Sequence, residues 1–298
     1  MKAIAGKLAA ALTMAFVMAG SASAHNGEFH CTSCKAWNVA QKPFKIYGNT
    51  YYVGTRELSA MLVTSPQGHV LLDGALPQSA PLIEANIKAL GFRIEDVKLI
   101  LNSHAHFDHA GGIAALQRAS GATVATSAHG AKVLEDGVIG KDDPQYDPTD
   151  DPRIDKVAAV KAVADGEVLK VGNLAITAHL TPGHTLGSTT WTWLSCENKR
   201  CLDVVYADSL TAVSADGYRF TDHPALLANF RATLDKVAAL KCDIVVSVHP
   251  GFTDVMEHQA GMQGKVNPFI DPKGCSELVA DARKRFDKRL ASEKLPQK

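Results

Sequence analysis

The sequence predicts an α/β fold. Short apolar runs of strand length alternate with longer segments in which apolar residues recur every three or four positions. No low-complexity linker interrupts the alternation, so we expect a single domain over residues 25–298. A chain of 298 residues with 46% hydrophobic and 21% charged residues has the composition of an ordinary globular protein.

The first 24 residues have the features of a cleaved export signal. Lys2 and Lys7 form a basic start, residues 8–20 are apolar, and a small-residue cleavage signature ends at Ala24. The apolar run is too short to span a bilayer, and no cysteine follows the cleavage signature as a lipid anchor would require. We therefore expect cleavage after Ala24, no membrane anchor and a periplasmic location.

The remaining elements follow from local periodicity. Strand-like runs occur at residues 60–64, 69–72, 97–101, 123–125, 174–178, 190–194, 203–207 and 244–248. Helical spacing occurs at residues 79–90, 112–119, 224–240 and 276–290. The last helix carries five Lys or Arg residues beside an apolar stripe. With 31 basic and 31 acidic residues in the whole chain, they indicate a solvated face and not a nucleic-acid patch.

One segment, residues 141–153 (KDDPQYDPTDDPR), has three prolines and no apolar periodicity. Structureless loops of this length in compact domains often form lids or binding loops, and a solvated acidic insertion is the alternative.

All six cysteines follow the export signal, where an oxidising compartment permits disulfides. Cys196 and Cys201 flank a polar turn between two strand-like runs, so a bridge there would close a hairpin. Cys242 and Cys275 would join the start of a late strand to the C-terminal segment. The CxxC motif at 31–34 lacks both a second CxxC and a following βαβ unit, which favours a small terminal clip over a zinc or redox motif.

The chemistry is concentrated in residues 97–112 (VKLILNSHAHFDHAGG). A buried strand is followed within a few positions by His104, His106, Asp108 and His109. Imidazoles and carboxylates are good ligands for first-row metals, and a single ion would not need all four. The motif therefore suggests two metal ions.

Two later histidines also follow strand-like runs, His184 in LTPGHTLG and His249 in VSVHPG. Ligands at the carboxyl ends of strands fit a site on the rim of an α/β core. We expect one zinc site of three histidines and a neighbouring site of two histidines and a carboxylate: His104, His106 and His184 in the first, and Asp108, His109 and His249 in the second. The other seven histidines are interpreted as ordinary surface or hydrogen-bonded residues: His25, His30, His69, His129, His179, His223 and His258.

Four segments, SHAHFDHAGG, TPGHTLGSTTW, YADSL and SVHPG, together resemble the metallo-β-lactamase superfamily. Combined with an export signal, they are similar to the zinc β-lactamases of subclass B3. The resemblance runs from Trp37 to the final helix. The HxHxDH motif alone specifies only the superfamily, because thioester hydrolases, lactonases and nucleases share it.

The resemblance implies a four-layer αβ/βα sandwich, with two mixed β-sheets face to face, helices outside and two zinc ions along one edge. It also implies the Cys242–Cys275 bridge. Ser209 would help to hold the substrate carboxylate, and Thr211 and Gln145 would make further substrate contacts. The loops around Trp37 and residues 142–153 would flank the cleft.

The implied function is hydrolysis of the β-lactam ring of penicillins, cephalosporins and carbapenems by a zinc-bound hydroxide. Asp108 would bind the second zinc ion and orient the hydroxide, as the catalytic carboxylate. A serine mechanism finds no support, since neither a GxSxG nor an SxxK motif is present. The expected partner is a small molecule and not a nucleic acid. A monomer is expected, with an oligomer left open.

Two other functions are compatible with parts of the sequence. Asp208 could instead align with the aspartate that bridges two metals in glyoxalase-type thioester hydrolases, which keeps a thioester or lactone hydrolase as the alternative. Export and the YADSL match favour a structural or supporting role for Asp208. A zinc-scavenging protein fits the histidine content but not the dispersed ligands, because sequestering sites usually form local His tracts.

Overall fold

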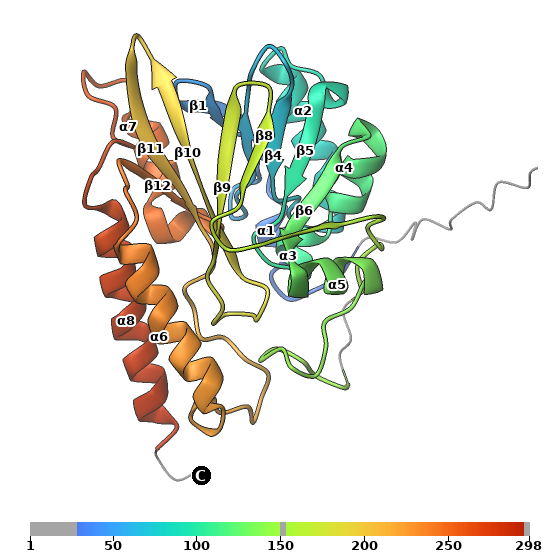
Figure 1. Ribbon diagram of the computed structural model, residues 1–298, viewed down its shortest axis with the longest axis vertical. Coiled ribbons are helices and arrows are strands. Elements are labelled where there is room, and N and C mark those ends of the chain that lie inside the picture. Colours follow the sequence, from blue (N-terminus) through green and yellow to red (C-terminus); the bar gives the residue numbers. More distant parts are fainter. Residues whose placement is uncertain (1–28, 150–152, 295–298) are drawn as a thin grey trace, which may run out of the picture.

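Two β-sheets form the centre of the protein, in a computed structural model that describes residues 29–149 and 153–294. They pack face to face with helices on their outer faces, so the elements form four layers (Figure 1). The predicted αβ/βα sandwich is therefore confirmed. The predicted export signal, at residues 1–24, lies outside the described residues.

The strands are β1 (Phe44–Tyr47), β2 (Thr50–Tyr52), β3 (Met61–Val63), β4 (His69–Leu72), β5 (Val97–Leu101), β6 (Thr123–Ser127), β7 (Lys161–Val163), β8 (Val168–Val171), β9 (Leu174–Leu180), β10 (Thr189–Glu197), β11 (Arg200–Ala207) and β12 (Ile244–Ser247). The helices are α1 (Cys34–Trp37), α2 (Ala80–Ala89), α3 (Phe107–Ala110), α4 (Ile113–Ser120), α5 (Ala128–Asp136), α6 (Pro224–Ala238), α7 (Val255–Gly261) and α8 (Gly274–Ser292).

Both sheets are mixed. The seven-stranded sheet has the order β1-β2-β3-β4-β5-β6-β7, antiparallel from β1 to β4 and parallel from β4 to β7. The five-stranded sheet has the order β12-β11-β10-β9-β8, and its only parallel pair among the described strands is β11 with β12. Each of the four parallel pairs needs a crossover, and α2, α4, α5 and α6 supply them.

Successive side chains along a buried strand point to opposite faces of its sheet, and this places them in different layers. Val70 and Leu72 of β4 point into the core between the sheets, whereas Leu71 points into the core beneath α2 and α4. In β12, Val246 faces the core between the sheets and Val245 faces α6 and α8. Strands that are buried on both faces read as continuous apolar runs, which explains why the sequence revealed them.

All eight predicted strands and all four predicted helices are present, with ends that differ by a few residues. Strands β1, β2, β7 and β8 were not predicted, because they are three or four residues long and mix polar with apolar residues. The short helices α1, α3 and α7 were not predicted either. Nor was α5, which begins where Ser127 accepts a hydrogen bond from Gly130 N at 3.1 Å. In the described part of the chain, no helix has the length and apolar character needed to cross a bilayer.

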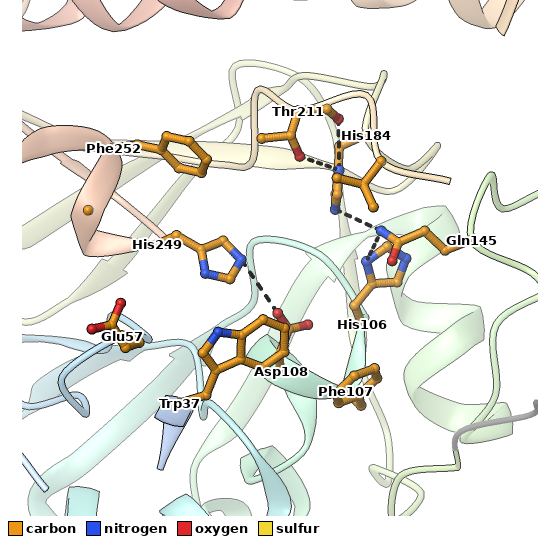
Figure 2. A pocket seen from close by; sticks show the side chains of 12 residues that line it. Trp37, Glu57, His106, Phe107, Asp108, Gln145, His184, Thr211, His249 and Phe252 are labelled. Carbon is orange, nitrogen blue, oxygen red and sulfur yellow. Dashed lines mark hydrogen bonds and ion pairs between the residues drawn. The ribbon is translucent and has the colours of Figure 1, made fainter. Parts of the chain in front are cut away.

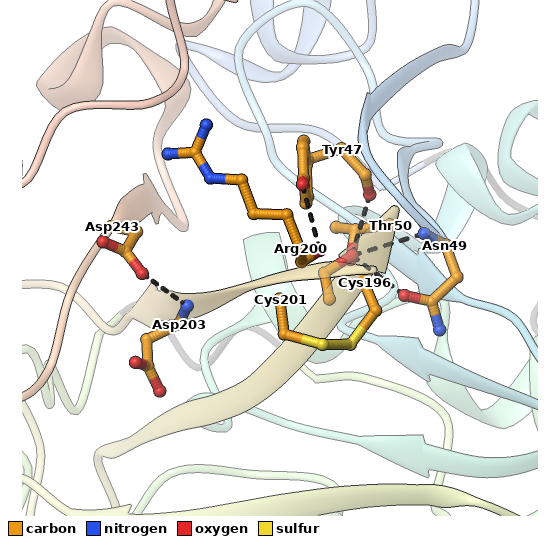
Figure 3. The surroundings of a disulfide bond; sticks show 9 residues. Tyr47, Asn49, Thr50, Cys196, Arg200, Cys201, Asp203 and Asp243 are labelled. Carbon is orange, nitrogen blue, oxygen red and sulfur yellow. Dashed lines mark hydrogen bonds between the residues drawn. A yellow bond between two sulfur atoms is a disulfide. The ribbon is translucent and has the colours of Figure 1, made fainter. Parts of the chain in front are cut away.

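Three disulfides are present, and each joins a pair that the sequence favoured. Cys196 and Cys201 face each other across the β10–β11 ladder and close the hairpin (Figure 3). Cys242, just before β12, is bonded to Cys275 in the first turn of α8. The CxxC motif forms a local clip at the start of α1.

Candidate metal centre

The six predicted ligands meet at one edge of the sandwich, where several strands end. His104 and His106 follow β5, Asp108 and His109 lie in α3, His184 follows β9, and His249 follows β12. They adjoin a pocket of about 410 Å³, a volume within the usual range for small-molecule sites. Figure 2 shows the pocket with His249 and Asp108 on one side of His106 and His184.

The first cluster consists of His104, His106 and His184, whose potential ligand atoms all lie within 4.8 Å of one another. The ring of His104 is held from behind, because its Nδ1 lies 2.6 Å from Oδ1 of Asp208. Its Nε2 is buried and has no hydrogen-bond partner among the residues described. A buried polar atom without a partner is costly, so this nitrogen fits a metal ligand.

The other two rings are also oriented by partners outside the cluster. Nε2 of His106 donates to Oδ2 of Asp143 at 3.0 Å, and Nδ1 of His184 donates to the Thr211 carbonyl at 2.9 Å. The remaining nitrogens converge on one point, since Nε2 of Gln145 lies 3.3 Å from Nδ1 of His106 and 3.4 Å from Nε2 of His184. Three imidazoles that present lone pairs to one region suit zinc.

The second cluster consists of Asp108, His109 and His249. Nε2 of His109 lies 3.2 Å from Nε2 of His249 and 3.2 Å from Oδ2 of Asp108, and that oxygen lies 3.5 Å from Nε2 of His249. Ligand atoms of His104, Asp108 and His109 also lie within 4.8 Å of one another, so the two clusters adjoin. Two nitrogens and one carboxylate oxygen in a near-equilateral triangle could hold a second ion.

The electrostatics favour neutral imidazoles at three of the five histidines, beside an ionised carboxylate. At the other two, His106 and His109, neighbouring aspartates outweigh the effect of burial and raise the pKa. Burial, reinforced by the charge of a neighbouring histidine, lowers the pKa of His184 and of His249 to about 4. The same causes hold the pKa of His104 well below its usual value. Burial alone would raise the pKa of Asp108, but the charge and hydrogen bond of His109 outweigh it and lower that pKa. Neutral imidazole and ionised carboxylate are the forms that bind metals.

A buried aspartate, Asp73, lies beneath this centre. Its carboxylate accepts hydrogen bonds from Ser103 N and Oγ, both at 2.7 Å, and from the Tyr206 hydroxyl at 2.9 Å. Its Oδ2 lies 4.0 Å from Nδ1 of His109. Burial raises the pKa of Asp73 to about 6, against the charge of His109 and these hydrogen bonds. Asp73 thereby fixes the start of the loop that carries His104.

Close backbone packing explains the glycines that follow the motif. A Cβ atom added to Gly112 would lie 2.3 Å from the carbonyl oxygen of Gly74, so only glycine fits. Gly74 N in turn donates to the His109 carbonyl at 2.8 Å. The turn after β4 thus buttresses α3 and the two ligands in it.

Two of the three predicted substrate contacts, Gln145 and Thr211, line the pocket together with Trp37. Ser209 is buried and does not line it. Its hydroxyl has no hydrogen-bond partner within the described part of the chain. In the predicted binding loop, residues 141–149 flank the pocket through Gln145.

Sequence reasoning missed Asp73 and Asp143. Asp73 follows the apolar run of β4, so the strand-end rule that found His249 could have found it. Asp143 lies in a segment without apolar periodicity. Its only indication in the sequence was its position two residues before Gln145, a predicted substrate contact. Its partner His106 is 37 positions away, and no local pattern links them.

Comparison with known proteins identifies the family of this chain. The family model of the metallo-β-lactamase superfamily matches residues 53–192. Among solved structures, the Rm3 metallo-β-lactamase is 50% identical, with 89% of this chain and 100% of that chain covered and a TM-score of 0.86. MEM-A1, a subclass B3 metallo-β-lactamase from a soil metagenome library, is 51% identical, with 86% and 98% covered and a TM-score of 0.83.

A hydroxyacylglutathione hydrolase of Methylobacterium nodulans is 30% identical over 122 residues, which are 41% of this chain and 37% of that protein. The chain spans little more than a third of the length of the curated relatives that it matches.

The fold and the site together define an enzyme of the metal-dependent hydrolase class. The chain belongs to the metallo-β-lactamase superfamily, and within it the chain resembles the enzymes of subclass B3.

Proposed function

We propose that the protein is an exported zinc hydrolase that opens the β-lactam ring of penicillins, cephalosporins and carbapenems. The observation that carries the proposal is the pair of adjoining ligand clusters beside one pocket, in a chain about half identical to metallo-β-lactamases over nearly its whole described length.

Two zinc ions would be held by the two clusters. His104, His106 and His184 would bind the first, and Asp108, His109 and His249 the second. When bound, such ions supply an activated water as nucleophile and polarise the carbonyl under attack. Asp108 stays ionised in its surroundings, so its carboxylate can accept a hydrogen bond from that water and orient it.

Substrate binding would use the side of the pocket near His184. Gln145 and Thr211 present an amide and a hydroxyl there, which suits the carboxylate and carbonyl groups of a β-lactam. Ser209 is buried and does not line the pocket, so its unpartnered hydroxyl would reach the substrate carboxylate through a water molecule.

Export to the periplasm, after cleavage at Ala24, is part of the proposal. Three disulfides support it, because such bonds persist in oxidising compartments. The antibiotic target also lies outside the cytoplasm.

A thioester hydrolase is the alternative, and it is favoured by the similarity to hydroxyacylglutathione hydrolases. In that function Asp208 would bridge the metals. Its Oδ1 instead lies 2.6 Å from Nδ1 of His104. Asp208 would then orient a predicted ligand, which favours the first proposal.

The two functions are separated by one experiment. Zinc-loaded protein without residues 1–24 is assayed on a carbapenem and on a glutathione thioester, with and without a chelator. We expect chelator-sensitive hydrolysis of the carbapenem, restored by zinc. Hydrolysis of the thioester alone would establish the alternative, and metal binding without turnover of either would indicate a zinc-binding protein.

A further inference from the structure

The pocket has a second end, away from Gln145 and Thr211, that the proposed chemistry does not use. Trp37, Glu57 and Phe252 line it, next to His249 (Figure 2). Among the described lining residues the acidic ones are Glu57 and Asp108, and Asp108 faces His109 and His249. Glu57 is therefore the carboxylate that a bound molecule meets at this end.

The backbone around Glu57 is fixed, although the side chain itself is exposed. It lies in a tight turn in which Thr55 N donates to the Leu58 carbonyl at 3.0 Å. A Cβ atom at Gly54 would lie 2.3 Å from that same carbonyl oxygen, so the turn requires glycine. Ser59 N donates to the Val248 carbonyl at 2.9 Å, directly before His249. The turn is thereby fixed to the strand end that carries a predicted ligand.

The same turn also fixes Trp37, which with Phe252 forms an aromatic wall of the pocket. Thr55 Oγ1 donates to the Trp37 carbonyl at 2.6 Å, and the Trp37 ring lies 5.7 Å from that of His249. Phe252 completes the wall and is itself 38% exposed. A carboxylate beside aromatic rings that line a pocket is a combination that can bind organic cations such as ammonium and pyridinium groups.

Two arginines lie nearby, and neither lines the pocket. Arg56 Nε is 4.0 Å from Glu57 Oε1 with both side chains exposed, a contact that contributes little. The Arg285 guanidinium lies 4.6 Å from the centre of the Phe252 ring. That ring thus already accepts a cation, while Glu57 and Trp37 remain available to a ligand.

We propose that Glu57, with Trp37, forms a subsite for a positively charged substituent of the substrate. Its negative charge also repels carboxylates, so the carboxylate of a β-lactam is directed toward the Thr211 end. The inference rests on the proposed function for its substrate class. It predicts that the enzyme prefers zwitterionic β-lactams to those with a second negative charge.

The turnover test uses three cephalosporins that differ in one remote substituent: a quaternary ammonium group, a neutral amide or a carboxylate. We expect Glu57→Gln to lower kcat/KM about three- to tenfold for the cationic substrate and to raise it similarly for the anionic one. The kcat/KM of the neutral substrate should change less than that of either charged substrate, because Glu57 neither attracts nor repels its remote substituent. Because Glu57 is exposed to solvent, the effect of Glu57→Gln on the two charged substrates should shrink as the salt concentration is raised.

The matched control is Glu277→Gln, which removes the same charge from an exposed position in the first turn of α8 and outside the pocket. It should leave all three kcat/KM values unchanged. Unaltered substrate ratios in Glu57→Gln, or an equal change in Glu277→Gln, would overturn the inference.

A binding experiment tests the cation subsite independently of turnover. Saturation-transfer NMR measures the binding of benzyltrimethylammonium ion to the zinc-loaded wild type and both variants. We expect Glu57→Gln alone to weaken binding at least about threefold. Equal affinity in all three proteins would refute the subsite. If the wild type hydrolyses none of the cephalosporins, the proposed function fails, and the binding result still decides the subsite.

Discussion

Replacing Asp143 with asparagine tests how the loop after α5 supports the metal centre. Asp143 Oδ2 lies 3.0 Å from Nε2 of His106, and both side chains are almost fully buried. The charge of Asp143, with its hydrogen bond, raises the pKa of His106 against the opposing effect of burial. Asparagine can still accept the hydrogen bond, so Asp143→Asn removes the charge while it keeps the shape of the side chain.

The expected effect is a weaker first zinc site. A hydrogen bond to a charged group contributes about 1 to 1.5 kcal/mol more than a neutral one, and 1.4 kcal/mol is a factor of ten. Loss of a carboxylate behind a ligating histidine typically lowers metal affinity about 10- to 100-fold. We expect Asp143→Asn to fall in this range, measured by competition with a chromophoric zinc chelator.

Asp142→Asn is the matched control. Asp142 is the preceding residue, but it pairs with His129 at 2.9 Å on the surface. Its replacement should leave zinc affinity unchanged, and thermal unfolding should show both variants folded. Wild-type zinc affinity in Asp143→Asn, or equal weakening in Asp142→Asn, would refute the reasoning.

Three further predictions follow from the geometry. His184→Ala should lower zinc stoichiometry and hydrolysis together, whereas His179→Ala, whose ring contacts Thr192, should change neither. Metal analysis beside activity assays checks this, and full zinc content in His184→Ala would remove it from the ligands. Ser209→Ala should raise KM severalfold more than it lowers kcat, because anchoring acts on the bound and transition states alike; an unchanged KM would contradict its role. Loss of the Cys242–Cys275 bridge, which spans 33 positions, should lower the free energy of unfolding by about 3 to 4 kcal/mol, and urea unfolding of the double serine variant measures it.

The candidate ligands could be picked out from the sequence because each lies in a local pattern. The HxHxDH motif follows the apolar run of β5, and His249 follows that of β12, so the sequence itself placed them at strand ends. The carboxylates that orient these ligands were harder to predict from the sequence. The sequence left two alternative roles open for Asp208, because its 2.6 Å contact with His104 joins residues 104 positions apart.

The sequence by itself indicated the alternating elements, the candidate ligands and a rationale for each favoured cysteine pair, because periodicity, motif spacing and turn composition are local properties. Only the tertiary structure decided which carboxylate supports which imidazole, that Ser209 is buried and does not line the pocket, and that Glu57 and Trp37 line it together. These relations depend on how loops from different strands pack against one another. Side-chain hydrogen bonds between residues far apart in sequence leave no periodic trace in either segment.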